Sequence, residues 1–317
     1  MTRPDESAGR RRREFLKVAG GVATTLVAAP DAFGQVARPN AAAPATRRQA
    51  APPDRGLWAT WYDLPVEGRD AYLDWLHGTY LPALLKRPGY LWAAHYATRE
   101  REGGGAQIQH TTDPKVGTGY HYILLVGATD ADVFGNPTPS AINATLPEAG
   151  RKMVAMRVGE RVNIMTETGR CEGRAATNAG MGAAPCIQIG SFNCPVEYEE
   201  EMHAGYVASR MPAHCATASC VRTRKLNSVA GWAKHVILYE YTSLDGFNRD
   251  YEAANSKSPL GVGGHSIVPY LVHAPSGPNS ALRLWPPVEA SRTGARSSIL
   301  RRHPLVSREI EPVLRRA

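Results

Sequence analysis

The sequence predicts an α+β protein made of two successive copies of one unit, each with the order strand, helix, strand, strand, helix, strand. Three observations predict it. Helix-spaced apolar stretches alternate with short aromatic or β-branched stretches in that order twice. Leu64-Pro65-Val66 is echoed by Cys194-Pro195-Val196, and His77-Gly78-Thr79-Tyr80 by His203-Ala204-Gly205-Tyr206. Hydrophobic residues make up 43% and charged residues 21% of the 317 residues, which is typical of a globular protein.

The first unit is assigned to residues 55–172. Residues 57–62 are aromatic and β-prone and end before Pro65, and a helix is predicted over 69–86. That helix places Leu73, Leu76, Tyr80 and Leu84 on one face, and Pro88-Gly89 stops it. Strands over 90–98 and 120–126, a helical segment within 130–158 and a strand near 161–168 complete the unit.

The second unit is assigned to residues 185–275, after a Gly/Ala-rich linker at 173–184. It is expected to contain strands over 186–192, 217–226, 232–241 and 265–273, and helices over 197–211 and 244–254. This order is the ferredoxin-like arrangement, in which the helices cover one face of a small sheet. The other face must be buried, so the two sheets are expected to pack face to face and to enclose a space.

The two ends of the chain differ in composition from the middle. Residues 11–17 (RRREFLK) resemble the twin-arginine export motif, and the apolar stretch behind them is too short to span a bilayer. Residues 1–34 are therefore predicted to be a signal peptide for the twin-arginine translocase, which places the protein in the periplasm or outside the cell. Residues 35–54 are predicted to form a disordered Pro/Ala linker, and 276–317 a basic, mostly disordered tail.

The charge distribution argues against nucleic-acid binding. The net charge is +8, but residues 1–54 carry +4 and residues 276–317 carry +5, which leaves −1 for the middle. The predicted folded part therefore has no basic patch to attract DNA or RNA. No uninterrupted apolar run reaches the ~18 residues of a membrane span, so no stable membrane insertion is expected.

Residues 75–90 (WLHGTYLPALLKRPGY), together with Ala94-His95-Tyr96, resemble the EthD-like branch of the dimeric α/β barrel superfamily. The resemblance implies that the tandem units form an intrachain dimeric α/β barrel. The second half lacks the Leu-Pro and Pro-Gly elements, and only its His203 and Tyr206 echo the motif. The superfamily includes polyketide cyclases, cofactor-independent monooxygenases, lactone isomerases and tandem-domain haem peroxidases, so the resemblance does not select one activity.

The candidate catalytic residues are His77, Tyr80, His95 and His121. A neutral imidazole accepts a proton near pH 7, and Asp74 lies one turn from His77. Strand alternation sends either a His or a Tyr from each strand toward the space between the sheets. A space lined by His and Tyr side chains suits an aromatic or hydrophobic compound. The candidate binding residues are Trp61, Tyr62, Trp92, Tyr96, Tyr122, His203 and Tyr206. The alternative is that these side chains only pack and satisfy their polar atoms within the core.

Metal and cofactor signals are weak. The histidine spacings match no standard zinc motif, so no metal and no cofactor are expected. Haem is the alternative because it needs one axial histidine, for which His235 and His265 are candidates. The five cysteines (171, 186, 194, 215 and 220) are expected to be buried thiols. Cys215 and Cys220 lie close enough to be bridged only if a turn separates them.

Three functions follow from these features. The first is an exported small-molecule-binding α/β barrel, with lyase, isomerase, cyclase or monooxygenase chemistry on an aromatic or hydrophobic compound. The second is a non-catalytic accessory or binding protein of the EthD-like type. The third is a haem peroxidase of tandem ferredoxin-like fold. The substrate and the state of the chain as a monomer or homo-oligomer stay open.

Overall fold

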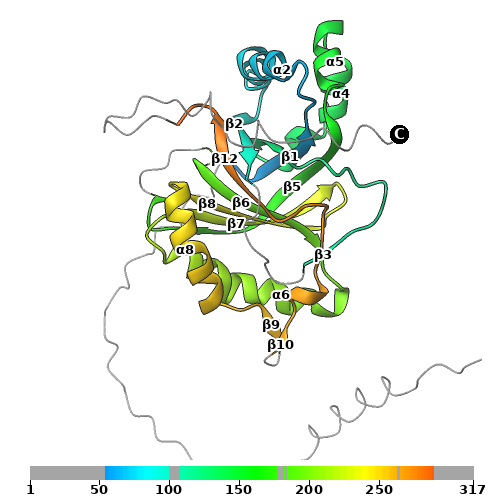
Figure 1. The fold of residues 1–317 in the computed structure, drawn as a ribbon. Helices are drawn as coiled ribbons and strands as arrows, with labels where there is room; N and C mark the ends of the chain where they lie inside the picture. The colour runs from blue at the N-terminus through cyan, green and yellow to red at the C-terminus, as the bar shows by residue number, and fades with distance from the viewer. Residues whose placement is uncertain (1–53, 100–107, 177–181, 183, 263–264, 289–317) are drawn as a thin grey trace, which may run out of the picture. The chain divides into compact units, whose positions relative to one another are not determined.

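The computed structural model describes residues 54–99, 108–176, 182, 184–262 and 265–288 (Figure 1). The predicted signal peptide, all of the 35–54 linker except Asp54, and the tail from residue 289 onward lie outside the described residues. The elements of the first half are β1 (Gly56–Asp63), α2 (Arg69–Trp75), the π-helical η1 (Leu76–Tyr80), α3 (Leu81–Leu84), β2 (Tyr90–Thr98), β3 (Gln109–His110), β4 (Tyr122–Ala128), η2 (Ala131–Phe134), α4 (Pro139–Ala144), α5 (Glu148–Val154) and β5 (Val158–Glu172).

The second half repeats the order of the main elements. They are β6 (Cys186–Asn193), η4 (Val196–Tyr198), α6 (Glu199–Gly205), the π-helical η5 (Tyr206–Arg210), α7 (Met211–Cys215), β7 (Cys220–Ala230), β8 (His235–Tyr241), α8 (Leu244–Lys257), β9 (Gly261–Val262), β10 (His265–Ser266), η6 (Val268–Tyr270), β11 (Val272–His273) and β12 (Asn279–Trp285). Each half therefore has one π-helical segment inside its first helical stretch. Such segments are rare and occur frequently at functional sites.

The first helical stretch runs from α2 through η1 to α3 and matches the helix predicted over 69–86 closely. Gly68, at φ 74°, turns the chain into the helix. Gly89, at φ 81°, turns it out again toward β2. A β-carbon at residue 89 would lie 2.7 Å from a methyl carbon of Val133, so glycine is required there for close packing as well.

The main sheet is continuous across both halves, in the order β12-β2-β4-β1-β5-β7-β8-β6-β11-β3. Strand β5 pairs with β1 in its own half and with β7 of the other half. Strand β12 pairs with both β2 and β6, and this closes the sheet into a barrel. The α+β class and the barrel-like antiparallel sheet are confirmed. Closure leaves no free strand edge between the two halves.

The sequence predicted two sheets that enclose a space, but the structure has one closed sheet whose interior contains buried side chains. The interior of the barrel holds buried ion pairs of Arg224 with Asp54 and Glu167 and a cluster of buried, mostly aliphatic side chains from all parts of the sheet: Leu57, Ala59, Trp61, Trp92, Ala94, Tyr96, Ile123, Leu125, Met165, Ile187, Ile189, Leu226, Val236, Leu238 and Ala281. Inward-facing residues of a small barrel fill its interior, because alternate side chains of each strand must point there. The interior of the described barrel is therefore a packed core.

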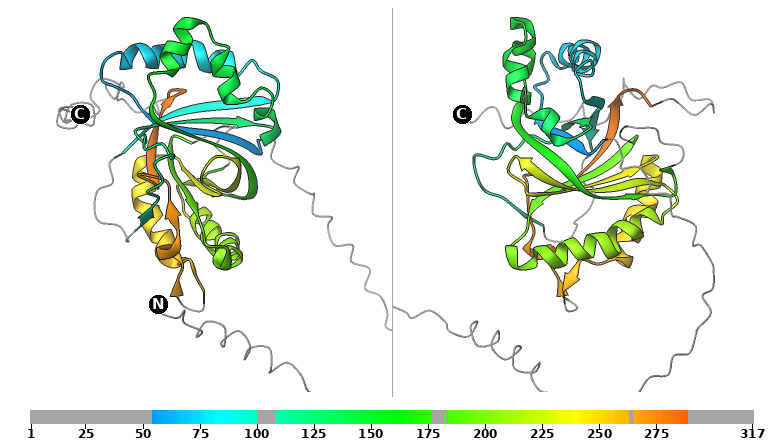
Figure 2. Two further views of the ribbon diagram at one scale, coloured as in Figure 1. Left: turned by 90° about the vertical axis from the view of Figure 1, so that its right-hand side faces the viewer. Right: turned by 180° about the vertical axis from the view of Figure 1, so that it is seen from behind.

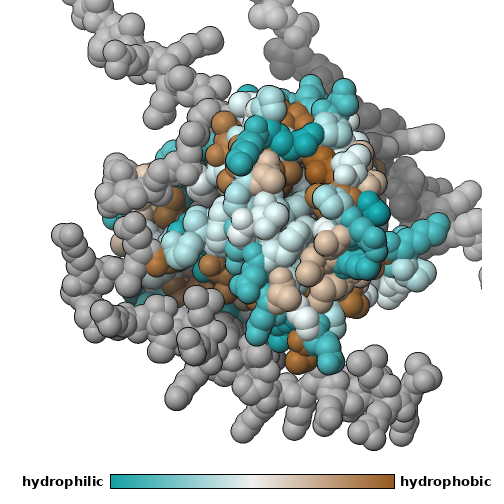
Figure 3. Space-filling view, turned by 90° about the horizontal axis from the view of Figure 1, so that it is seen from above, coloured by the Kyte–Doolittle hydropathy of each residue, from teal (hydrophilic) through white to brown (hydrophobic). Residues whose placement is uncertain are grey.

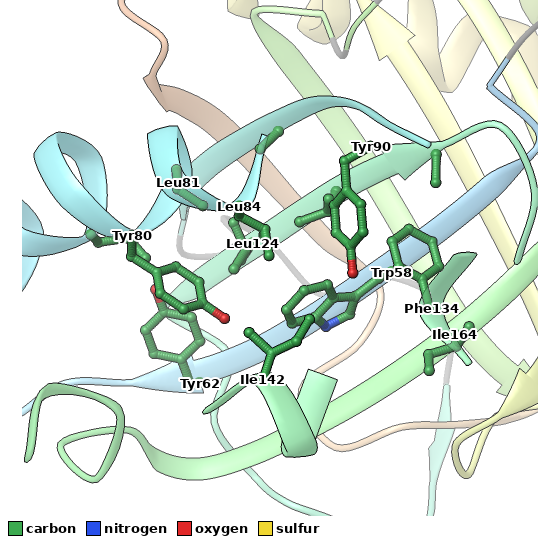
Figure 4. Close-up of a cluster of buried hydrophobic side chains, with 14 of the residues drawn as sticks. Trp58, Tyr62, Tyr80, Leu81, Leu84, Tyr90, Leu124, Phe134, Ile142 and Ile164 are labelled. Carbon is green, nitrogen blue, oxygen red and sulfur yellow. The ribbon is translucent and has the colours of Figure 1, made fainter. Parts of the chain in front are cut away.

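Two further layers lie outside the barrel. Helices α2, α4 and α5 lie on one side of the strands, and α6 and α8 lie on the opposite side (Figures 1 and 2). The first layer packs the helices on β1, β2 and β4, with aromatic residues such as Trp58, Tyr90 and Phe134 at its centre (Figure 4). The second layer is built around Phe192, Tyr206 and Tyr241.

The C-terminal part of the fold differs from the prediction. The sequence placed a closing strand at 265–273 and a tail from residue 276, but residues 279–285 form β12 inside the main sheet. Pro278 and Pro286 flank this strand, and a short segment between prolines has the composition of a linker. Its alternation is nevertheless that of a strand: Ala281 points into the barrel core, and Leu282 packs against the outer layer.

On the face seen from above, hydrophobic residues form small patches between hydrophilic ones (Figure 3). None of the described helices combines the length and the apolar character needed to cross a membrane.

Candidate functional site

Three polar side chains form a hydrogen-bonded chain in the first outer layer. The hydroxyl of Tyr62, on β1, lies 2.9 Å from Nε2 of His95, on β2. Nδ1 of His95 lies 2.9 Å from Nε2 of His77, in the π-helical segment η1. Tyr62 and His95 are completely buried, and His77 is half-buried. The Tyr62–His95–His77 relay therefore leads from the core toward the surface.

Aromatic rings enclose this relay on both sides. Tyr122 of β4 stacks on His95, with centroids 5.4 Å apart, and on Tyr62, with centroids 5.8 Å apart. Trp285 of β12 lies opposite His95 in the strand pairing and stacks on His77, with centroids 6.2 Å apart. The outer end of the relay is thus covered by an aromatic ring from the last described strand, which belongs to the other half.

A buried cation lies at the inner end of the relay. The guanidinium carbon of Arg157 lies 5.0 Å from the ring centroid of Tyr62. Arg157 donates from Nε to the Tyr72 hydroxyl, at 2.8 Å, and from Nη1 to Glu160, at 2.7 Å. The Tyr72 ring in turn packs edge to face on the Tyr62 ring, with centroids 5.8 Å apart. A buried arginine stays charged, so this cation is a fixed feature of the site.

The tautomers of the two histidines set the direction of the hydrogen bonds. Each neutral imidazole carries one N–H, and the Tyr62 hydroxyl can donate to Nε2 of His95. With that tautomer, Nδ1–H of His95 donates to Nε2 of His77, and Nδ1–H of His77 is the proton at the outer end.

Burial sets the protonation states. It lowers the pKa of His77 to about 4, although Asp74 opposes the shift. Burial also lowers the pKa of His95 well below its usual value, and His77 and Arg157 add to the shift. The pKa of Tyr62 is raised well above 10 by burial, and Arg157 partly offsets this. Both imidazoles are therefore neutral and Tyr62 is protonated at neutral pH, which is the state a relay needs.

Two of the four candidate catalytic residues lie outside the relay. The Tyr80 hydroxyl donates to Oδ1 of Asn143 at 2.7 Å, and its ring lies beside Tyr62 in the same layer (Figure 4). His121 pairs with Asp63, with Nδ1 and Oδ1 2.8 Å apart. Burial would raise the pKa of Asp63, but hydrogen bonds from His121 and from the backbone lower it. His121 therefore forms a separate, partly exposed pair.

The candidate binding residues are divided among three places. Tyr62 belongs to the relay and Tyr122 stacks on it, whereas Trp61, Trp92 and Tyr96 point into the barrel interior on the other side of the sheet. In the interior, Trp92 donates to Asp54 at 3.0 Å, Tyr96 donates to the carbonyl of Ala184 at 2.9 Å, and Arg161 lies over the Trp61 ring. Consecutive strand residues face opposite sides, so these residues cannot share one site.

The two candidates from the second half do not reach the relay either. His203 is exposed on α6, and Tyr206 is buried in the second outer layer. Sequence reasoning also missed three residues of the site, namely Tyr72, Arg157 and Trp285. Tyr72 lies four residues before Leu76 on the predicted helix, so helical spacing placed it on the buried face. No local signal distinguishes Arg157, and Trp285 lay in the predicted tail.

Comparison with known proteins assigns neither a family nor an activity to this chain. No protein-family model and no curated protein matches this chain. Similar solved structures are of the dimeric α/β barrel type. A monooxygenase-like protein from Lactobacillus acidophilus covers 73% of this chain and 94% of its own length at 6% identity and a TM-score of 0.43. A dye-decolorizing protein from Vibrio cholerae covers 73% and 94% at 10% identity and a TM-score of 0.42. A chlorite dismutase variant from Candidatus Nitrospira defluvii covers 72% and 89% at 12% identity and a TM-score of 0.40.

The expectation that no cofactor is used is corrected by these findings. Chlorite dismutases and dye-decolorizing peroxidases are haem-binding proteins, and both occur among the similar structures. A missing multi-ligand motif does not exclude haem, because haem needs only one protein ligand. Among the described residues, no group of three or more His, Cys, Asp and Glu side chains is arranged to hold a metal ion.

Among the described residues, three of the four buried histidines do not fit a haem ligand. Both ring nitrogens of His235 are hydrogen-bonded, Nε2 to Glu199 at 3.1 Å and Nδ1 to Asn227 at 3.3 Å. His95 has both nitrogens in the relay, and His214 bonds to Tyr241 and Asn255. An axial ligand needs a ring nitrogen available to iron, and these three offer none. The side chain of His265 lies outside what the structure describes.

Proposed function

We propose that the protein is a proton-transferring enzyme acting on a small aromatic or hydrophobic compound at the outer end of the Tyr62–His95–His77 relay. The observation that carries this proposal is the continuous chain of two 2.9 Å hydrogen bonds between a buried hydroxyl and a half-buried imidazole. The reaction classes that use such a transfer here are lyase, isomerase, cyclase and monooxygenase chemistry.

In the tautomer that carries a proton on Nδ1, His77 acts as an acid. Nδ1–H of His77 gives its proton to the substrate, and Nε2 of His77 takes the proton of His95 Nδ1. Nε2 of His95 then takes the Tyr62 proton. The negative charge ends on the Tyr62 oxygen, within the field of the Arg157 cation. Because burial disfavours a phenolate, the transfer suits a strongly basic acceptor, such as a carbanion or enolate. The same steps in reverse, starting from the Tyr62 phenolate, take the proton of an activated C–H bond, so one proton leaves carbon and one returns to it in each exchange cycle.

The surroundings of His77 support an aromatic or hydrophobic ligand. Trp285 stacks on the His77 ring and is only half-buried, and Trp75 lies one residue before the π-helical segment. Aromatic faces bind planar apolar molecules by stacking and by area burial. The π-helical geometry widens the turn at Leu76–Tyr80, where the side chain of His77 leaves the helix.

The finer fold and location proposals rest on the sequence together with the strand orders. The orders β2-β4-β1-β5 and β7-β8-β6-β12 repeat one pattern, which supports two tandem ferredoxin-like units of the EthD-like type. The RRREFLK motif supports export by the twin-arginine translocase to the periplasm or beyond. Export does not depend on the chemistry at His77.

A non-catalytic binding protein is the competing function, and one observation favours it. His95 is completely buried with both ring nitrogens bonded, so the relay also satisfies buried polar atoms without any reaction. Both functions predict ligand-induced stabilisation. They differ in whether protons move between ligand and solvent.

Hydrogen–deuterium exchange in the ligand tests the proposal. Compounds that raise the melting temperature are selected first, and each is then incubated with the protein in D₂O. Mass spectrometry is expected to show deuterium at an acidic C–H of the bound compound. His77→Ala should reduce the exchange rate at least tenfold, because a general acid or base typically contributes about 100-fold or more to the rate. The matched control His203→Ala replaces the repeat counterpart, which is exposed, and should retain full exchange. Stabilising ligands that never exchange would establish the binding function instead.

A further inference from the structure

Three of the five cysteines converge where the two halves meet, far from the relay in sequence. Cys171 lies on β5, Cys215 ends α7, and Cys220 begins β7. The consecutive residues Arg174 and Ala175 donate their amides to the carbonyls of Cys215, at 3.2 Å, and of Cys220, at 3.0 Å, so these two cysteines lie close together. The Cys215 sulfur lies 3.0 Å from the carbonyl oxygen of Cys171 and 3.4 Å from the Thr223 hydroxyl. Cys215 is the central member of this thiol cluster.

The chain between Cys215 and Cys220 supplies the geometry that a disulfide between them needs. Residues 216–219 form a turn, held by hydrogen bonds from the amide of Thr217 to the carbonyl of His214 and from the amide of Ala216 to that of Pro212. An extended segment of this length would hold the two cysteines too far apart for a disulfide, whereas a turn folds the chain back between them. All five cysteines are free thiols here, so the cluster is in its reduced form.

The members of the cluster differ in exposure and acidity. Cys171 is half-buried, Cys215 is 6% exposed and Cys220 is completely buried. The S–H groups of Cys220 and Cys171 and the Thr223 hydroxyl lower the pKa of Cys215 against the effect of burial. The same hydrogen bond and burial raise the pKa of Cys220. Cys215 is therefore the first of the three to ionise, and the thiolate is the reactive form of cysteine.

We propose that Cys215 and Cys220 form a thiol–disulfide exchange site for small disulfides, with Cys171 at its rim as the positioning thiol. The Cys215 thiolate attacks one sulfur of the disulfide, which forms a mixed disulfide and releases one thiolate. The Cys220 sulfur then attacks the Cys215 sulfur and displaces the second thiolate, which takes the Cys220 proton. One small disulfide is reduced to two thiols, and one intramolecular disulfide forms.

Oxidised glutathione is the probe, and peptide mapping by mass spectrometry is the readout. In the full-length protein we expect a Cys215–Cys220 disulfide. Cys220→Ser should stop the reaction at the mixed disulfide and leave one glutathione on Cys215. Cys215→Ser should remove both products from the cluster. The matched control Cys194→Ser replaces a half-buried cysteine with a pKa raised to about 11 and should behave as wild type.

The pH profile separates a reactive site from slow chance oxidation. Mixed-disulfide formation in Cys220→Ser should level off below about pH 8.5, the pKa of an ordinary thiol. The proposal is overturned if folded wild-type protein keeps five free thiols, or if glutathione is found on Cys186 or Cys194 rather than on Cys215. A rate that keeps rising beyond that pH would also overturn it. None of these outcomes depends on the relay chemistry.

Discussion

The outer layers of the two halves have the same architecture but different polar content. Tyr62 pairs with Tyr122 across β1 and β4. At the matching place in the second half, Phe192 pairs with His235 across β6 and β8. The first pair carries a hydroxyl into the layer and stacks on His95, whereas Phe192 carries no polar atom. His235 instead pairs with Glu199 at the edge.

The neighbouring strand shows the same contrast. His95 of β2 lies opposite Leu124, and Lys225 of β7 lies opposite Ile237, two residues along from the pairs above. Lys225 is 3% exposed and donates to Oδ1 of Asn227 at 3.2 Å. His203, the repeat counterpart of His77, is exposed. The second half folds without a relay, so the fold does not require the one in the first half. This supports a functional reason for its presence.

The largest effect is expected from breaking the relay at its centre. His95→Leu removes both hydrogen bonds and leaves the Tyr62 hydroxyl and His77 Nε2 without this partner. Each lost bond with a buried partner costs about 1–2 kcal/mol, so the free energy of unfolding should fall by about 3 kcal/mol. Urea denaturation followed by circular dichroism measures this change.

Tyr62→Phe is a milder change at the same site. It gives β1 the residue that β6 has at the matching position, Phe192. It removes one hydroxyl and should lower the free energy of unfolding by about 1 kcal/mol. A loss for His95→Leu no larger than that for Tyr62→Phe would show that the histidines contribute packing and no hydrogen-bonded chain.

The relay should also make stability depend on pH. The pKa of His77 is about 4 and that of His95 is well below 6.5 in the folded protein, against about 6.5 in the unfolded chain. The unfolded state therefore binds more protons, and stability is lost as the pH falls from 6.5 toward 4. Each such histidine contributes a slope of up to about 1.4 kcal/mol per pH unit.

The second half titrates as well, because burial lowers the pKa of His214 to about 4 and also lowers that of His235. Unfolding free energies measured from pH 7 to pH 5 should therefore fall for every variant. His95→Leu should reduce the slope by about 1 kcal/mol per pH unit relative to wild type. A slope for His95→Leu equal to that of wild type would mean that folding does not shift the pKa of His95.

The individual strands and helices could be predicted from the sequence, but the strand pairing that closes the barrel could not. Alternation and helical spacing located the strand at 90–98 and the helix at 69–86, because both depend on local periodicity. Alternation also separated His95 from Tyr96, but it could not say which of them faces the helices. Both faces of β2 are buried, so neither is marked by polar residues. Trp285 was missed because β12 joins strands that are distant in sequence, and no local pattern records such a pairing.

The smallest effect on the free energy of unfolding is expected at Lys225, the counterpart of His95 in the second half. Burial lowers the pKa of Lys225, so its ammonium form is destabilised in the folded protein. Lys225→Met keeps the length of the side chain and removes the buried charge, and it gives up one hydrogen bond to Asn227. Removing a buried charge in this way is neutral or stabilising, and we expect a gain of about 0–1 kcal/mol in the same urea experiment. Substitution of His95 would then lower the free energy of unfolding, whereas substitution of Lys225 at the equivalent position would raise it or leave it unchanged. A loss of about 3 kcal/mol for Lys225→Met would instead show that the second half depends on its own polar network as much as the first does.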